Sequence, residues 1–497
     1  MKLKVKDMDI KTGGVLVAIL NQKDAELMDL HPLDRIKIKN RDKIDTVVLD
    51  VATSNKEVRP GSIGVFDDVM GALKLKDKQT VEIITARKPV SIDYIKKKLE
   101  GKLLTKKEIN QIVWDIVHNK LSDIELTYFV AACYSNELSM KETIWLTKAM
   151  TSHGDILRLK KYPVLDKHCV GGVAGNRTTP IVVSIIAAAG LTIPKTSSRS
   201  ITSPAGTADT MEVLTDVSLS MSKMKKVVEK TNGCLVWGGA LNLAPSDDKI
   251  IKVEKPLSID AKSQLLSSVM AKKLSVSATH LLIDIPMGKG SKITSMQKAK
   301  LLKKDFESIA QGIGIKIKVV MTDGTQPIGN GIGPALEAKD VLYVLTRDKK
   351  APLDLRNKAL RLAGLMLEIS GRFQKGKGVG FAREILDSGK AYSKFIDIIK
   401  AQGMNCKDPK KINVGRFKYD LVSKRNGKIH SISNRAISKV ARVAGAPDDA
   451  GAGIYLYKHV GDNVVKGEKI FTLYSHNKVK LGFAKDALEK LDGIVIN

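Results

Sequence analysis

The stretch YPVLDKHCVGGVAGNRTTPIVVSIIAAAGLTIPKTS, residues 162–197, predicts a strand, a helix and a second strand in succession. Strand-like runs open and close it, and the apolar segment PIVVSIIAAAG between them has a helical pattern. The same alternation continues along the chain, where GCLVWGG, THLLIDIPMG and GIKIKVVMTDG are strand-like and DAKSQLLSSVMAKKL is helical. Strands alternating with crossover helices predict a parallel or mixed sheet, in which ligands bind beyond the carboxyl ends of the strands.

Two regions precede this α/β domain, which we place at residues 160–418. Residues 1–86 alternate apolar and polar side chains in short runs broken by Gly, Pro and Asp, which predicts a small β-rich domain. Residues 88–158 carry apolar side chains at helical spacing and predict a helical bundle, to which later helices contribute. The helix N-caps expected in this bundle are Ser91, Thr105, Ser122 and Ser139.

Residues 419–497 are expected to form a C-terminal α+β domain. The segment GDNVVKGEKIFTL resembles the turn of a lipoyl-type barrel-sandwich hybrid, but no Asp-Lys hairpin for a prosthetic group accompanies it, which favours a structural role. The predicted fold class is therefore multidomain α/β plus β, with an N-terminal β-rich domain, a helical bundle, an α/β sheet domain and a C-terminal α+β barrel-sandwich-like domain. A chain of 497 residues with 43% hydrophobic content is long enough to bury several cores.

The net charge of +30 is the strongest feature of the composition. Nucleic-acid binding is one interpretation, because cationic surfaces attract phosphates. The lysines are spread along the whole chain, however, and no zinc-finger spacing or aromatic RNA-binding signature accompanies them. This distribution favours a solvated, lysine-rich surface, and a small anionic substrate would also be attracted by its field.

The cysteines and the N-terminal sequence indicate the cellular compartment of the protein. The cysteines are far apart in the chain and have no metal or redox spacing, as expected for free thiols in a reducing compartment; they are Cys133, Cys169, Cys234 and Cys406. The N-terminus has no apolar leader, and no run of about 18 apolar residues occurs. The sequence therefore predicts a soluble, cytoplasmic protein without a membrane partner.

A glycine-rich segment, DKHCVGGVAGNRTTP at residues 166–180, lies between a predicted strand and a predicted helix. Gly171, Gly172 and Gly175 let backbone N–H groups approach an anion, and the N-terminus of the following helix adds its dipole. Lys167 could add a point charge. The alternative is a turn that needs glycine only for packing, and the segment matches neither a Walker A sequence nor a dinucleotide fingerprint.

A hydroxyl-rich segment, KTSSRSITSPAGTADTME at residues 195–212, follows the next strand. Ser203 before Pro204 predicts the N-cap and first residue of a helix. Arg199 could grip a phosphate as a planar fork, and hydroxyl donors come from Ser197, Ser198, Ser200, Thr202, Ser203 and Thr207. The alternative is a turn whose hydroxyls satisfy its own backbone. Two such loops, each between a strand and a helix, favour an anion site.

Together these motifs resemble a known family. DKH-x-x-GGV, followed some thirty residues later by S-x-R-S…G-T-x-D, resembles the thymidine and pyrimidine nucleoside phosphorylases, and SRSITSPAGTADTME is similar to the AMP phosphorylase branch. The resemblance covers roughly residues 88–490, and an extra N-terminal β domain is also a feature of that branch.

The resemblance implies an enzyme, a pentosyltransferase that acts in nucleotide salvage or degradation. Members of the branch cleave nucleoside 5′-monophosphates with inorganic phosphate and release a free base and ribose 1,5-bisphosphate. It implies AMP as substrate, with CMP and UMP also expected, and no cofactor or metal. It further implies that phosphate and nucleotide bind in a cleft between the helical bundle and the α/β domain, and that the protein forms a homodimer or larger homo-oligomer.

The resemblance also implies the site residues, with Asp260 as the proton donor. A purine leaves easily only when a ring nitrogen is protonated as the glycosidic bond breaks, and a carboxylic acid with a raised pKa suits that role. The alternative is that Asp260 caps the following helix, on which Ser268 and Lys272 share one face. The substrate-binding positions implied are Lys167, Gly172, Ser198, Arg199, Ser200, Ile201, Thr202, Ser203, Thr207, Ser268 and Lys292.

This sequence departs from the nucleoside-cleaving members at two positions. Val253 stands where they use an arginine to hold the pyrimidine, which argues against simple thymidine specificity. Cys169 stands where many have serine, which is the stronger hydrogen-bond partner. We do not assign His168 a catalytic role, because a structural or positioning role explains it equally well. The glycine-rich residues 322–338 are expected to shape a strand–helix turn near the site.

Three alternative functions stay open. A pyrimidine nucleoside phosphorylase would not need the 5′-phosphate of its substrate. A phosphoribosyltransferase would handle similar ligands with pyrophosphate and would depend on a divalent metal. A nucleic-acid-binding protein would use the net charge and would bind duplexes in a salt-sensitive way without phosphorolysis.

Overall fold

The computed structural model describes residues 1–497 except 14–15, 201–202, 258, 260 and 492, and it leaves the side chains of 255 and 257 undescribed. The chain divides into two compact units. The first comprises Met1–His153 and Pro245–Ser268, and the second comprises Gly154–Ala244 and Val269–Asn497. Among the described residues, no helix combines the length and the apolar character that a membrane crossing requires.

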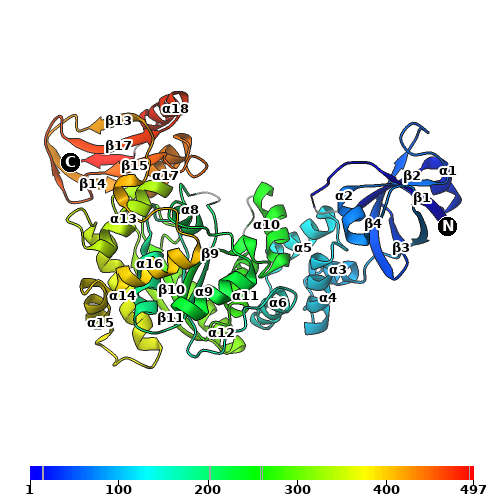
Figure 1. The fold of residues 1–497 in the computed structure, drawn as a ribbon, viewed down its shortest axis with the longest axis horizontal. Helices are drawn as coiled ribbons and strands as arrows, with labels where there is room; N and C mark the ends of the chain where they lie inside the picture. The colour runs from blue at the N-terminus through cyan, green and yellow to red at the C-terminus, as the bar shows by residue number, and fades with distance from the viewer. Residues whose placement is uncertain (14–15, 201–202, 258, 260, 492) are drawn as a thin grey trace. The chain divides into compact units, whose positions relative to one another are not determined.

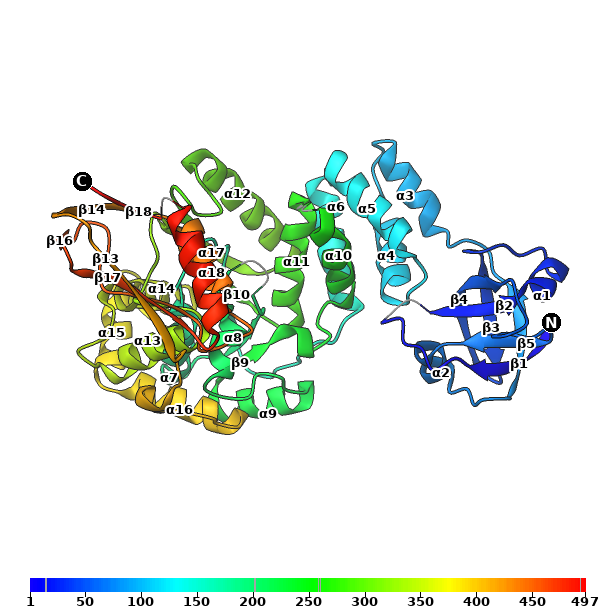
Figure 2. The same cartoon turned by 90° about the horizontal axis from the view of Figure 1, so that it is seen from above.

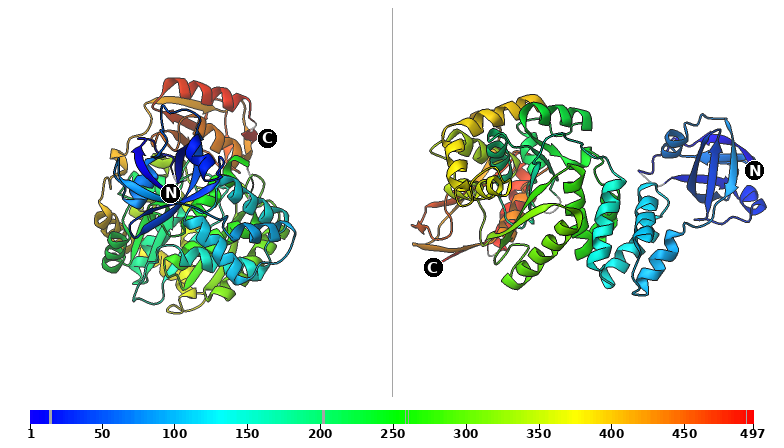
Figure 3. Two further views of the ribbon diagram at one scale, coloured as in Figure 1. Left: turned by 90° about the vertical axis from the view of Figure 1, so that its right-hand side faces the viewer. Right: turned by 90° about the horizontal axis from the view of Figure 1, so that it is seen from below.

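The N-terminal part of the first unit is a closed barrel of strands in the order β1-β5-β2-β4-β3-β6 (Figure 3). Alternate side chains point inward, so that Leu3 and Val5 of β1 are buried while Lys2 and Lys4 are exposed. The strands are β1 (Lys2–Asp7), β2 (Val17–Asn21), β3 (Arg35–Asn40), β4 (Lys43–Ala52), β5 (Ser62–Val65) and β6 (Thr80–Thr85), accompanied by helices α1 (Gln22–Leu27) and α2 (Asp67–Leu73).

The rest of the first unit is helical. Its helices are α3 (Ser91–Leu99), α4 (Lys106–Val117), α5 (Asp123–Ser135), α6 (Met140–Ser152), α10 (Pro245–Leu257) and the first part of α11 (Lys262–Ser275). Helix α10 packs against α4, α5 and α6 (Figure 2).

Three of the four helix N-caps expected from the sequence are confirmed. Thr105, Ser122 and Ser139 each cap a helix within a capping box that a glutamate three residues later completes. The expectation for Ser91 is wrong, because Ser91 is the first residue of α3 and Val90 holds the N-cap position without a side-chain hydrogen bond.

The second unit is built on parallel strands, as the alternation of strand and helix predicts (Figure 1). Strands β11, β10 and β7 pair in parallel, as do β8 and β9, and a parallel bridge between Val164 and Thr192 links the two groups. The strands are β7 (Leu165–Cys169), β8 (Ile193–Ser197), β9 (Gly233–Trp237), β10 (His280–Met287) and β11 (Lys316–Asp323), so each strand-like run named above is confirmed.

Helices pack around these strands. Helix α7 packs on β8 and β9, while α12 and α14 pack on β10 and β11. Besides the end of α11, the helices are α7 (Thr178–Ala188), α8 (Thr207–Glu212), α9 (Met221–Thr231), α12 (Met296–Ile313), α13 (Pro334–Thr346), α14 (Leu353–Ile369), α15 (Gly378–Asp387) and α16 (Lys390–Gln402), with short 3₁₀ turns at Gly238–Ala240 and Pro409–Lys411.

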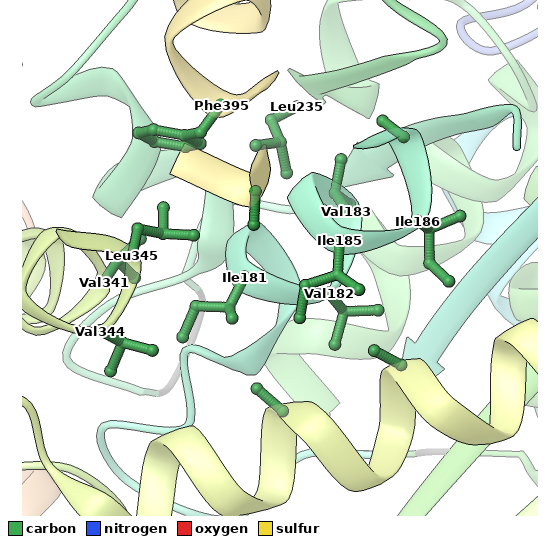
Figure 4. Packing of buried hydrophobic residues seen from close by; sticks show 14 of the residues in the cluster. Ile181, Val182, Val183, Ile185, Ile186, Leu235, Val341, Val344, Leu345 and Phe395 are labelled. Atoms are coloured by element: carbon green, nitrogen blue, oxygen red, sulfur yellow. The ribbon is translucent and has the colours of Figure 1, made fainter. Parts of the chain in front are cut away.

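Helix α7 is the centre of the main hydrophobic core. Ten of its residues are buried, so it can lie only in the interior. Burying an aliphatic side chain of this size stabilises the fold by about 1.5–3 kcal/mol. Figure 4 shows its side chains among those of β9, α13 and α16, with the labelled residues Ile181, Val182, Val183, Ile185, Ile186, Leu235, Val341, Val344, Leu345 and Phe395.

The C-terminal part of the second unit has two small sheets, ordered β12-β15-β17-β13 and β16-β14-β18. Its elements are β13 (Phe417–Val422), β14 (Gly427–Ile432), α17 (Asn434–Val443), β15 (Gly453–Leu456), β16 (Asn463–Val464), β17 (Lys469–Ser475), α18 (Lys478–Glu489) and β18 (Ile494–Ile496). Strand β12 (Gly331–Ile332) pairs with β15, although the sequence boundary at residue 418 assigns it to the α/β domain. This pairing joins segments more than a hundred residues apart, which local patterns do not reveal.

Candidate active site

Polar loops follow the carboxyl ends of β7, β8 and β10. These ends lie on one edge of the parallel sheet, where α/β proteins bind ligands. The loop after β7 contains Gly171, Gly172 and Gly175, which have φ angles of 93°, 88° and 70°. These left-handed conformations are easy for glycine and costly for other residues. They also bring the loop to the N-terminus of α7, which no side chain caps.

Gly172 lies directly against the loop after β10. A side-chain Cβ at this position would come within 2.3 Å of the backbone nitrogen of Lys292. Only glycine leaves room for this approach, so two of the predicted site residues are neighbours. The side chain of Lys292 is exposed to solvent.

Lys167 lies beneath the start of α7 and is 1% exposed. Its ammonium group donates hydrogen bonds to the hydroxyls of Thr178 (2.9 Å) and Thr179 (3.3 Å). Burial lowers the pKa of Lys167. A cation taken out of water in this way is stabilised by a neighbouring anion, so the position suits a phosphate site.

Asp166 and His168 point to the opposite face of β7 from Lys167, because side chains alternate along a strand. The buried carboxylate of Asp166 accepts a hydrogen bond from Lys273 (2.8 Å) and lies 3.5 Å from the ammonium group of Lys195. Burial lowers the pKa of Lys195 to about 7, against the attraction of Asp166. Burial, reinforced by the nearby lysines, also lowers the pKa of His168 well below its ordinary value. His168 is therefore neutral at pH 7.

The hydroxyl-rich loop is closed by a carboxylate. Asp209 accepts hydrogen bonds from the backbone N–H groups of Ser200 and Gly206, both at 2.8 Å. The Ser200 hydroxyl donates to the backbone carbonyl of Ser203, so part of the loop satisfies its own backbone. Ser198 and Ser203 are exposed.

The helix after this loop begins later than the sequence suggested. The prediction that Ser203 is the N-cap and Pro204 the first helical residue is wrong, because α8 starts at Thr207 with Gly206 as its N-cap. Asp209, the third residue of α8, accepts a hydrogen bond from the backbone N–H of the N-cap residue Gly206, so the first turn is closed from within the helix and not by Ser203.

Arg199 is held within its own segment. Its guanidinium donates to both carboxylate oxygens of Glu212 at 2.5 and 2.6 Å, lies 3.4 Å from Asp209, and stands over the ring of Trp237. The bond to Glu212 raises the pKa of Arg199. The fork expected to grip phosphate is therefore occupied by carboxylates in this structure.

The remaining predicted residues lie in several places. Ser268 and Lys272 are both half-buried and four residues apart in α11, which confirms that they share a helix face. Val253 is buried in α10. Asp260, Ile201 and Thr202 lie outside the described residues.

Sequence reasoning missed Arg177, Glu337 and Asn434. Arg177 and Glu337 form a buried ion pair. Asn434 accepts a hydrogen bond from the backbone of Ala174 and donates one to the carbonyl of Gly324, and so links two loops. The sequence does contain one indication for Arg177, because a cation next to a helix N-terminus is unfavourable and therefore implies a specific anionic partner. The partners themselves are distant in the sequence.

No metal centre is found in the part of the chain that the structure describes. None of its groups of His, Cys, Asp and Glu side chains brings three or more together in an arrangement that could hold a metal ion.

Comparison with protein families assigns three segments of the chain. A model described as "Glycosyl transferase family, a/b domain" matches residues 161–392, and its companion, the helical bundle domain, matches residues 92–154. A third, the "Pyrimidine nucleoside phosphorylase C-terminal domain", matches residues 428–494.

Several curated relatives are similar over their whole length. The AMP phosphorylase of Pyrococcus furiosus is 45% identical, with 100% of this chain and 98% of the relative covered. The AMP phosphorylase of Thermococcus kodakarensis is 46% identical, with 97% and 95% covered. A Legionella pneumophila (strain Corby) protein named putative thymidine phosphorylase is 42% identical, with 99% and 95% covered.

Solved structures show the same fold at low sequence identity. Anthranilate phosphoribosyltransferase from Thermus thermophilus has a TM-score of 0.53 at 18% identity, covering 62% of this chain and 99% of that chain. The Saccharomyces cerevisiae enzyme has a TM-score of 0.51 at 17% identity, covering 63% and 98%. At these identities the likeness establishes the fold alone.

Proposed function

The chain belongs to the glycosyl transferase family of the AMP phosphorylases, and we propose that it cleaves nucleoside 5′-monophosphates with inorganic phosphate, giving a free base and ribose 1,5-bisphosphate. This proposal rests on the edge of the parallel sheet in the second unit where the loops after β7, β8 and β10 lie, which we call the loop edge. There the buried ammonium group of Lys167, the uncapped N-terminus of α7 and the loop of Lys292 lie together in a chain that matches these enzymes end to end.

In the proposed reaction, a phosphate oxygen forms a bond to C1′ of the ribose as the bond from C1′ to the base nitrogen breaks. The electron pair of the broken bond goes to the base, and Asp260 supplies the proton that makes the base a good leaving group. Lys167 and the N–H groups at the start of α7 bind and orient an anion. No step requires a cofactor.

Two anions need donors in this reaction, the attacking phosphate and the 5′-phosphate of the nucleotide. The chain offers Lys167, Lys292, the exposed hydroxyls of Ser198 and Ser203, and Thr207. Arg199 contributes by bracing the hydroxyl-rich loop through Glu212 and Asp209. Gly172 contributes by admitting the backbone of Lys292.

A pyrimidine nucleoside phosphorylase is the second candidate function. It is favoured by the name of the Legionella relative and by the C-terminal family match. The buried Val253 argues against it, because an apolar side chain offers no donor to a pyrimidine carbonyl.

A panel of substrates tests the choice between these functions. The full chain is incubated with inorganic phosphate and AMP, CMP, UMP, adenosine or thymidine, and free base is measured. Base release from the monophosphates supports the proposal, with AMP, CMP and UMP all expected to react. Equal or faster release from adenosine or thymidine would support the nucleoside phosphorylase instead, and dependence on pyrophosphate and a divalent metal would favour a phosphoribosyltransferase.

The N-terminal barrel is proposed to serve assembly and not chemistry. Its buried apolar residues form a core of their own within the barrel. Removing residues 1–86 is expected to reduce the size of the homo-oligomer in light scattering while phosphorolysis stays measurable. A folded truncated chain of unchanged size, or one without any activity, would contradict this assignment. The cytoplasmic location inferred from the sequence also stays a prediction.

A further inference from the structure

Arg177 connects three segments that surround the loop edge. It is the residue immediately before α7 and is only 7% exposed, which is unusual for arginine. One terminal nitrogen donates to the hydroxyl of Thr207 (2.9 Å), and the other donates to the backbone carbonyl of Ala205 (2.9 Å). Its Nε donates to the carboxylate of Glu337. A single side chain therefore ties the glycine-rich loop to the hydroxyl-rich loop and to α13.

Glu337 is anchored in turn. It is 1% exposed, accepts a hydrogen bond from the backbone N–H of Gly333 (3.1 Å), and accepts another from the hydroxyl of Thr210 (3.2 Å). Burial raises the pKa of Glu337, and Arg177 opposes that shift. The guanidinium is thus held against a fixed carboxylate, and its planar fork holds the two contacts to the hydroxyl-rich loop in one geometry.

The position of Arg177 is unfavourable without these partners. A cation at a helix N-terminus opposes the helix dipole, and a buried ion pair costs more desolvation than a surface pair. A small polar residue would satisfy the helix start better. The arginine must therefore be explained by the bridge that it makes.

The contact to Thr207 has a further consequence. The oxygen of Thr207 accepts from Arg177, so its own hydroxyl proton points away from the guanidinium. Among the described residues, that proton has no hydrogen-bond acceptor. Arg177 therefore leaves this hydroxyl oriented as a donor, which is the form that binds a phosphate oxygen.

We propose that Arg177 is a positioning residue, which through Glu337 fixes the glycine-rich and hydroxyl-rich loops relative to each other so that both bind inorganic phosphate. This inference rests on the proposed function, because it takes phosphate as the ligand of these loops. Arg177 is assigned to positioning and not to substrate contact, because each of its three nitrogens donates a hydrogen bond within the bridge.

Three variants, Arg177→Lys, Arg177→Met and a double variant, separate positioning from stability. Arg177→Lys keeps a cation for Glu337 but cannot make the forked contacts to Ala205 and Thr207. It is expected to fold with a melting temperature near that of the wild type, and to raise both the Kd and the KM for phosphate about tenfold, with a smaller change in kcat. The double variant Arg177→Met with Glu337→Gln removes both buried charges. It is expected to melt above Arg177→Met alone and still to bind phosphate about tenfold more weakly than the wild type.

The measurements are calorimetric binding of inorganic phosphate to the full chain, thermal melting and steady-state kinetics. Arg356→Met is the matched control, because it removes an arginine that pairs with Asp387 outside this bridge, and its phosphate affinity should not change. Normal phosphate affinity in Arg177→Lys, or recovery of both melting temperature and affinity in the double variant, would overturn the proposal. Absence of phosphate binding by the wild type would overturn it too. A wild type that binds phosphate but cleaves no monophosphate would contradict only the proposed function, because the binding comparison remains valid.

Discussion

The Asp260→Asn variant is expected to turn over AMP at least about a hundredfold more slowly than the wild type, while nucleotide binding survives. Asparagine has nearly the shape of aspartate but cannot deliver a proton. An adenine that departs without protonation leaves as an anion, so the barrier to breaking its bond to C1′ rises. General acid catalysis contributes about 10²–10⁴-fold in rate, which sets the size of the expected loss.

The comparison is made on kcat and on the Kd for AMP. Asp93→Asn serves as the control, because it removes a carboxylate from an exposed pair with Lys96 in α3 and should leave both quantities unchanged. Turnover within a few-fold of the wild type would show that Asp260 does not supply the proton.

AMP is expected to be cleaved several powers of ten more efficiently than adenosine. A hydrogen bond to a charged group contributes about 1.5–3 kcal/mol, and each 1.4 kcal/mol corresponds to about tenfold. We expect two or three such bonds to the 5′-phosphate. Binding energy from a non-reacting phosphate of this kind can also be used to align the ribose for attack, which would raise kcat as well as affinity.

Lys292→Ala tests whether contacts to the 5′-phosphate cause the preference for AMP over adenosine. It should reduce kcat/KM for AMP far more than any residual cleavage of adenosine. Lys289→Ala is the matched control, since it removes the same charge from the same exposed loop. An equal loss for AMP and adenosine in Lys292→Ala would exclude a role for Lys292 in holding the 5′-phosphate.

The strands and most of the helices of the second unit follow from local pattern. The apolar run of α7 and the strand-like runs on either side of it predict a buried crossover helix between parallel strands, and the structure has this arrangement. The capping boxes at Thr105, Ser122 and Ser139 were equally readable, because all their partners lie within three residues. Short-range chemistry determines these features.

Features that depend on distant partners could not be read in this way. Arg199 pairs with Glu212, thirteen residues later, and Arg177 pairs with a glutamate 160 residues away. The capacity of an arginine to bind phosphate is visible at a single position, whereas the carboxylate that competes for it is brought near only by the fold.

The central claim is that inorganic phosphate replaces the base on C1′ of a nucleoside monophosphate. Phosphorus NMR of the full chain with AMP and inorganic phosphate tests it most directly, with adenine measured in the same sample. We expect the inorganic phosphate signal to fall in step with adenine release, and two phosphate ester signals of equal size to appear, from the 1- and 5-positions of ribose. Adenine release without loss of inorganic phosphate, or no release from AMP at all, would contradict it.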